Sequence, residues 1–157
     1  SLPAGRTRRT GSDPMKIIRD DREKTPWVFP GVDVEEARLQ TGDYTVEGFE
    51  DRFAVERKSL NDLATSVGSD RNRFESEIRR AQEMDNFAVV IEGTPDDVRH
   101  HRYYSKIHPN AVLGTVKKWP WKYGTLKFVW AGDDDRAAQE CLRLLDRWYL
   151  LAASDLF

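Results

Sequence analysis

The stretch Phe53-Ala54-Val55-Glu56-Arg57-Lys58-Ser59 decides how this chain of 157 residues is organised. Its first three residues are apolar and predict a β-strand, but the strand closes on three consecutive charged residues. The chain then turns helical, because apolar side chains recur at helical spacing at Leu60, Leu63, Ala64 and Val67. The sequence therefore predicts a strand that delivers its charged end to the start of a helix.

A β-hairpin is predicted to bring a second carboxylate to this strand. Residues 41–46 read as one strand, residues 47–51 supply a turn, and residues 52–56 return as the partner strand. Asp43 and Glu56 both lie at the ends of the hairpin that are far from its turn. They can therefore face each other across neighbouring strands.

Two carboxylates beside a lysine suit metal-assisted cleavage of a phosphodiester. Asp43 and Glu56 could hold a hard divalent cation such as Mg²⁺ through their oxygens. Lys58 could position the attacking water and stabilise the charge that grows on the phosphate. The alternative is a solvated charge triplet, which is the commoner case for Glu-Arg-Lys in isolation. The compound pattern favours the metal site, because Gly-Asp-Tyr precedes the strand and Ser59 is followed three residues later by Asp62.

Composition places the chain among globular proteins of one domain. Its 18.2 kDa, with 39% hydrophobic and 33% charged residues, can form a proper core. No apolar run has the length of a membrane span, and no secretory signal is visible. The single cysteine, Cys141, excludes an internal disulfide and favours a reducing cytosol, so we expect a cytoplasmic location. The formal net charge of −2 neither supports nor excludes DNA binding.

The N-terminal region divides into a leader and a first strand. Residues 1–14 are polar and rich in Arg and Gly, and we expect a disordered basic leader before a domain that spans residues 15–157. Residues 15–19 predict a strand that ends in Asp20-Asp21-Arg22-Glu23, where an acidic pair is costly to bury unless it meets a cation or an Arg. Residues 34–39 fit either a short strand or a helical turn.

The rest of the chain alternates helices and strands. We expect residues 96–106 to form a mobile loop near the active face, without a zinc site at its adjacent histidines. Helices are predicted over residues 61–67, 71–84, from 108 onwards and 133–153, and strands over residues 87–91 and 125–131. The order β, ββ, αα, β, α, β, α predicts a central mixed sheet flanked by helices, an α/β fold. No Gly-rich phosphate loop is present, so no nucleotide cofactor is expected.

One segment interleaves lysines with aromatic residues. It contains Lys117, Lys118, Trp119, Trp121, Lys122 and Tyr123. A DNA-facing surface and core aromatics flanked by solvated lysines explain this pattern equally well.

With these residues in place, the chain resembles the nuclease domain of the XPF-type structure-specific endonucleases, and in particular their small stand-alone versions in bacterial and phage genomes. Residues 20–23 match the first acidic motif of that family, and Gly42-Asp43-Tyr44 matches the second. Glu56-Arg57-Lys58-Ser59 with Asp62 matches the central Glu-Arg-Lys-x-x-x-Asp signature. Arg71 falls at a family helix arginine, and His108-Pro109-Asn110 resembles the family's start of a helix.

The resemblance implies a restriction-endonuclease-like fold and a DNA cut that depends on Mg²⁺ or Mn²⁺. It assigns the metal to Asp43 and Glu56, with Asp20 nearby, and the catalytic lysine role to Lys58. Strand alternation sends Asp20 and Asp21 to opposite faces, and the motif favours Asp20 as the inward residue. The full expected catalytic set is Asp20, Asp43, Glu56, Arg57, Lys58 and Asp62, where Arg57 orients the site or contacts phosphate and Asp62 supports the basic residues. The expected DNA contacts are Arg22, Arg71, Arg73, Lys117 and Lys118.

The chain departs from the family in one respect. Family members usually carry a tandem helix-hairpin-helix domain after the nuclease domain and often dimerise, whereas we expect these 157 residues to hold the nuclease domain without it. We therefore expect an endonuclease for branched, flap or single-strand-containing DNA that acts alone, as a homodimer or with a partner subunit. The alternative is a catalytically inactive nuclease-like scaffold that binds DNA or recruits a partner.

Overall fold

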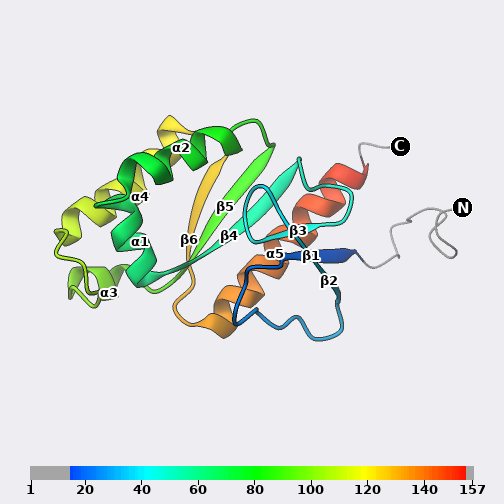
Figure 1. Cartoon of the computed structure of the whole chain (residues 1–157), viewed down its shortest axis with the longest axis horizontal. Helices are drawn as coiled ribbons and strands as arrows, with labels where there is room; N and C mark the ends of the chain where they lie inside the picture. The colour runs from blue at the N-terminus through cyan, green and yellow to red at the C-terminus, as the bar shows by residue number, and fades with distance from the viewer. Residues whose placement is uncertain (1–14, 155–157) are drawn as a thin grey trace, which may run out of the picture.

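The computed structural model describes residues 15–154, so the expected leader over residues 1–14 lies outside the described residues. A central six-stranded sheet has helices on both of its faces (Figure 1). The strands are β1 (Lys16–Asp20), β2 (Asp33–Ala37), β3 (Tyr44–Val46), β4 (Phe53–Ser59), β5 (Asn86–Glu92) and β6 (Leu126–Trp130). The helices are α1 (Leu60–Val67), α2 (Arg71–Ala81), α3 (Pro95–Arg99), α4 (Pro109–Lys122) and α5 (Asp134–Ser154).

The sheet is mixed, as the sequence predicts. Its strand order is β2-β1-β3-β4-β5-β6. The pairs β1–β2, β4–β5 and β5–β6 are parallel, whereas β1–β3 and β3–β4 are antiparallel. Tyr44 pairs with Val55, which confirms the predicted hairpin. The charged end of β4 is thereby placed in the middle of the sheet, between β3 and β5.

Two hydrophobic clusters hold the helices against the sheet. On one face α5 packs through Leu144, Leu145 and Trp148, and its Cys141 is fully buried there. On the other face α1, α2 and α4 form the second cluster. β5 contributes to both clusters, since Val90 faces α5 and Val89 faces the other helices. The apolar run that predicts this strand reflects that two-sided burial.

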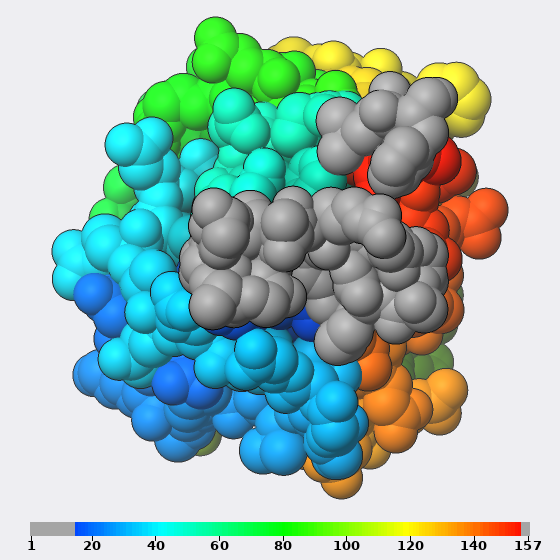
Figure 2. Space-filling model, turned by 90° about the vertical axis from the view of Figure 1, so that its right-hand side faces the viewer, coloured from blue at the N-terminus to red at the C-terminus, as the bar shows by residue number. Residues whose placement is uncertain are grey.

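The end of α5 also contacts the hairpin turn. The rings of Phe49 and Tyr149 meet edge to face with their centroids 5.6 Å apart. Figure 2 shows this side of the molecule, where the cyan and turquoise hairpin region lies close to the red end of α5. None of the helices within residues 15–154 is both long and apolar enough to span a membrane.

The structure changes two expectations for the connecting segments. Residues 33–37 form the edge strand β2, which resolves the choice between a strand and a helical turn. The loop predicted over residues 96–106 is wrong at its start, because α3 occupies Pro95–Arg99. Thr94 and Asp97 form a capping box, and Pro95 stands in the first turn, where proline favours a helix.

Candidate active site

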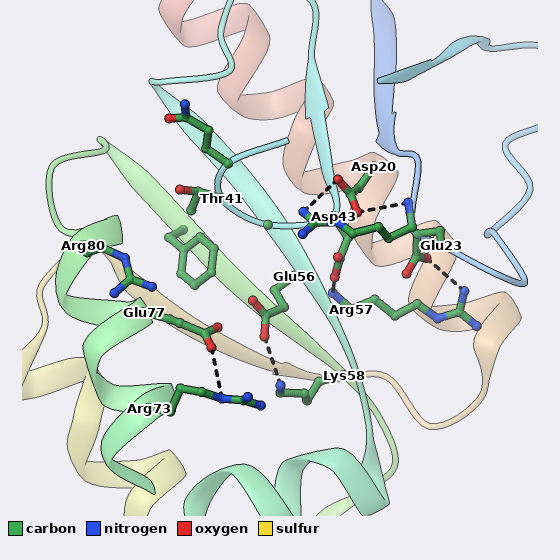
Figure 3. Close-up of a pocket in the computed structure, with 14 residues that line it drawn as sticks. Asp20, Glu23, Thr41, Asp43, Glu56, Arg57, Lys58, Arg73, Glu77 and Arg80 are labelled. Atoms are coloured by element: carbon green, nitrogen blue, oxygen red, sulfur yellow. Dashed lines mark hydrogen bonds and ion pairs between the residues drawn. The ribbon is translucent and has the colours of Figure 1, made fainter. Parts of the chain in front are cut away.

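A cleft opens where the charged end of β4 meets the end of β1 and the side of α2. Its volume is about 480 Å³, and Figure 3 shows the side chains that line it. Five of its lining residues carry a carboxylate, namely Asp20, Glu23, Asp43, Glu56 and Glu77. Five are cations, namely Arg22, Arg57, Lys58, Arg73 and Arg80. Charges of both signs therefore meet in one concave site.

The hairpin fixes Asp43 against β4. The Asp43 amide donates to the carbonyl of Val55 at 2.8 Å, and the Asp43 carboxylate accepts the amide of Arg57 at 2.8 Å. Gly42 makes this close approach possible, since its φ of +75° suits glycine and a Cβ there would lie 2.8 Å from the Cβ of Ala54. The carboxylate is therefore held in one place by backbone contacts on both sides.

Partial removal from water makes the charged forms of the Asp43 and Glu56 carboxylates unfavourable. Burial raises the pKa of Asp43 from its ordinary 3.8 to about 7, and the neighbouring charge of Glu56 adds to the rise. Burial also raises the pKa of Glu56, while Lys58 acts in the opposite direction. A nearby cation would stabilise the charged forms of these two carboxylates.

Lys58 supplies a cation at the same point. Its Nζ lies 3.1 Å from Oε2 of Glu56 and 4.7 Å from the centroid of the Phe74 ring. Its side chain is only 14% exposed, so the ammonium is directed into the cleft and not toward bulk solvent. Figure 3 shows Glu56 and Lys58 pointing toward one another across from α2.

Asp20 is buried, but its oxygens already have partners. It is 2% exposed and accepts hydrogen bonds from Nε and Nη2 of Arg22 and from the amides of Arg22 and Leu39. Asp21 points outward and pairs with Arg38 at 2.7 Å. Asp20 is thus the inward residue of the two, and its contribution to a metal site stays a prediction.

The Arg57 side chain turns away from the two carboxylates. Its guanidinium pairs with Glu23 and with Glu92, donates to the carbonyl of Thr25, and lies 4.9 Å from the centroid of the Trp27 ring. Of the two roles that the sequence leaves open for Arg57, this geometry favours orienting the site. The sequence reasoning missed Glu23 and Glu92 as partners, although Glu23 stands in the first acidic motif.

The remaining predicted residues are spread over three places. Arg22 and Arg73 lie in the cleft, where Arg73 approaches Asp70 and Glu77 at 3.3 and 4.0 Å. Arg71 and Lys118 line a different groove, and Lys117 is exposed on α4.

Asp62 lies in the first turn of α1, where its amide donates to the hydroxyl of Ser59. Its charge contributes to the raised pKa of Glu56, yet within residues 15–154 no ion pair joins its carboxylate to Lys58 or Arg57. A supporting role for Asp62 stays a prediction.

Sequence reasoning also missed Glu77 and Arg80 on the cleft wall. Together with Arg73 they repeat at helical spacing on one face of α2, which is the signal that points to a shared surface.

The donor set fits a hard divalent cation. No group of three or more His, Cys, Asp or Glu side chains among residues 15–154 is arranged to hold a metal. Mg²⁺, however, is commonly bound by one or two carboxylates, with waters and substrate phosphates completing its shell. Asp43 and Glu56 are half-buried, the charge of Glu56 raises the pKa of Asp43, and both carboxylates supply such oxygens. These two residues would hold the ion.

The fold and the cleft define an α/β domain with an acidic and basic site at the centre of a mixed sheet. The family model of the ERCC4 domain matches residues 20–140. The chain therefore belongs to the ERCC4 domain family, which confirms the resemblance found in its sequence.

Known relatives agree with this assignment. A protein described as the 3'-flap repair endonuclease Xpf of Saccharolobus solfataricus is 36% identical over 91 residues, which cover 54% of this chain and 37% of that protein. A solved structure of XPF from Aeropyrum pernix has a TM-score of 0.65 at 24% identity and covers 83% of this chain and 60% of that one. The XPF structure from Aeropyrum pernix in complex with DNA has a TM-score of 0.64 at 21% identity and covers 90% of this chain and 66% of that one.

These matches confirm the predicted restriction-endonuclease-like fold. The chain spans only 37% of the length of the curated relative and 60% and 66% of the two solved chains.

Proposed function

We propose that this protein is a metal-dependent DNA endonuclease that cuts branched, flap or single-strand-containing DNA. The observation that carries the proposal is the half-buried pair Asp43 and Glu56 beside Lys58 in a cleft whose opposite wall holds Arg73 and Arg80. The printed descriptions of the relatives support it, since one is a 3'-flap repair endonuclease and another is an XPF structure in complex with DNA.

Each side chain has a role that follows from its position. Mg²⁺ or Mn²⁺ bound by Asp43 and Glu56 would supply Lewis-acid activation of the scissile phosphate and its water. The Lys58 ammonium orients the attacking water and stabilises negative charge on the phosphate, because it is held inside the cleft. Arg73 and Arg80 hold the flanking phosphates from the wall formed by α2.

Two further residues support this machinery. Asp20 keeps Arg22 at the mouth of the cleft through its bidentate pair. Arg57 fixes the backbone of β4 to the loop over residues 21–30. DNA is the proposed partner, with a homodimer or a partner subunit as the assembly, and the proposed location is the cytoplasm, in the nucleoid or the host cell.

A cleavage panel tests the proposal. Labelled single-stranded, duplex, nicked, fork and flap DNA would be presented with Mg²⁺, Mn²⁺ or EDTA. We expect metal-dependent cutting that falls by at least about a hundredfold in Lys58→Ala and in Asp43→Asn, the usual scale for removing a group that stabilises a transition state. Lys127→Ala is the matched control, because Lys127 is an exposed lysine on β6.

The competing proposal is an inactive scaffold that binds DNA or recruits a partner. It predicts DNA binding without cutting under either metal. Equal cutting by the parent protein, Lys58→Ala and Asp43→Asn would contradict the assignment of the active site to this cleft.

A further inference from the structure

A second groove lies on the other side of α2 from the cleft. It runs between the start of α2 and the outer face of α4, and its volume is about 480 Å³. Figure 1 shows α4 running alongside α2. Three cations line the groove, Arg71, Lys118 and Lys122, and its lining contains no carboxylate. The groove therefore differs in charge from the cleft, where acidic and basic side chains are equal in number.

Arg71 is held in one orientation in this groove. Its Nη1 donates to the carbonyl of Val67 at 3.0 Å and to the hydroxyl of Thr115 at 2.9 Å, and the guanidinium lies 4.8 Å from the centroid of the Trp119 ring. The Thr115 hydroxyl donates in turn to the carbonyl of Ala111 at 2.9 Å. All of these partners are neutral, so Arg71 is positioned without being neutralised.

The groove keeps an excess of positive charge. Lys122 is neutralised by Glu75 at 2.8 Å. Within residues 15–154, neither Arg71 nor Lys118 forms an ion pair with a carboxylate. A fixed guanidinium and an ammonium that line the same concave surface are groups that commonly bind phosphate.

Gly114 leaves room for a ligand to approach α4. A Cβ built on this residue would meet no heavy atom within 4 Å. Glycine inside a helix usually costs about 0.5–1 kcal/mol relative to alanine. Gly114 lines the groove together with Arg71 and Lys118, so this open space can accept a substituted side chain without a clash.

We propose that this groove binds the backbone phosphates of a DNA arm that leaves the cleft across the first turn of α2. The inference rests on the proposed function and adds a second DNA subsite to it. Arg73 faces the cleft and Arg71 faces the groove, because two residues on a helix are about 200° apart. A helix with its side chains is about 10–12 Å wide, so an arm of a few nucleotides is long enough to bridge the two sites.

Gly114→Glu tests the groove directly, and Gly114→Ala is its matched control. Both substitutions fit the open space and favour the helix, but only glutamate places a negative charge beside Arg71 and Lys118. Affinity would be measured in EDTA by fluorescence anisotropy, with flap DNA whose arm has about one or about ten nucleotides, one too short and one long enough to cross the width of α2.

We expect the parent protein and Gly114→Ala to bind the long arm about tenfold more tightly than the short arm, the scale of one charge-assisted hydrogen bond. Gly114→Glu should lose this preference. Lys118→Ala should lower the slope of log affinity against log salt by about 0.7, the value for one phosphate contact on a single strand. Equal affinity for both arms in the parent protein, or an unchanged preference in Gly114→Glu, would overturn the proposal.

The two proposals fail in different ways. Metal-dependent cutting of short-arm DNA should be the same in the parent protein and in Gly114→Glu, since the cleft is untouched. Absence of cutting in both would contradict the endonuclease, while the binding comparison would still decide whether the groove holds a DNA arm.

Discussion

At the level of single residues, the cleft carboxylate of Asp43 lowers the stability of the folded state. Its carboxylate is largely removed from water, and its pKa rises to about 7 because of that desolvation and of the charge on Glu56. Between pH 3.8 and about 7 the unfolded chain releases this proton while the folded chain keeps it. The folded state therefore loses stability as the pH rises through this range, by up to about 4 kcal/mol in the absence of metal.

Asp43→Asn should remove that cost. We expect the variant to be more stable than the parent at pH 8 in EDTA, by about 2–4 kcal/mol, and about equally stable at pH 3.5, where the parent carboxyl is protonated in the folded state and mostly protonated in the unfolded state. Urea unfolding at both pH values measures the difference. A variant that is less stable than the parent at pH 8 would contradict the assigned environment of Asp43.

Gly42 and Gly48 allow a matched comparison at the same hairpin. Both have positive φ, +75° and +90°, but a Cβ on Gly42 would meet Ala54 at 2.8 Å, while a Cβ on Gly48 would meet nothing within 4 Å. Gly42→Ala adds a steric clash to backbone strain and should lower the free energy of unfolding by about 2–5 kcal/mol. Gly48→Ala adds strain alone and should cost about 1–2 kcal/mol. Chemical denaturation distinguishes them, and equal losses would argue against the close contact.

At the level of elements, Arg57 ties the loop over residues 21–30 to the middle of the sheet. It connects β4 to Glu23 and Thr25 in the loop and to Glu92 at the end of β5. Lysine cannot reproduce several directed contacts from one planar group. Arg57→Lys should therefore lower stability by about 1–3 kcal/mol and increase amide exchange in the loop.

Arg38→Lys provides the comparison for this element. Arg38 pairs with Asp21 at the surface, where its side chain is 64% exposed, and an exposed pair is worth little. Urea unfolding and hydrogen exchange should show a small effect for Arg38→Lys. A comparable loss in both variants would mean that the Arg57 contacts do not hold the loop.

The elements themselves were largely predictable from local pattern. The hairpin and the strand that ends in Glu56 follow from alternation and turn residues, and α5 follows from its apolar stripe. Residues 34–39 could not be assigned, because an edge strand with one exposed side has little apolar signal. α3 was missed since its five residues are too short for periodicity, although Thr94 and Asp97 carry the capping signal.

At the level of the whole molecule, charge is distributed in patches that the net value conceals. The formal net charge is −2, yet Arg73 and Arg80 line the cleft, and Arg71 and Lys118 line the groove. If these four residues contact phosphates, log affinity for DNA should fall with log salt with a slope of about −3. Anisotropy titrations across a range of KCl concentrations in EDTA measure this slope. A value near zero would exclude phosphate binding by these surfaces.

The candidate site was predictable where neighbouring strands bring residues together, as with Asp43 and Glu56. Contacts between segments that are distant in the sequence could not be predicted. Helical spacing alone places Arg71 and Arg73 on different sides of α2, but only packing against α4 gives Arg71 its contact with Thr115 and its groove. In the same way, nothing local indicates that Arg57 meets Glu92, because the register between β4 and β5 decides that contact.

The buried Cys141 has a practical consequence for measuring this fold. It is the only cysteine in the chain, it is fully buried on the face of α5 that packs against the sheet, and burial raises the pKa of its thiol well above the ordinary value. A disulfide reagent in solution can react with it only when α5 separates from the sheet. The rate of this single chemical event therefore reports, in native buffer and without denaturant, how often the molecule opens and how much a bound metal or DNA slows that opening.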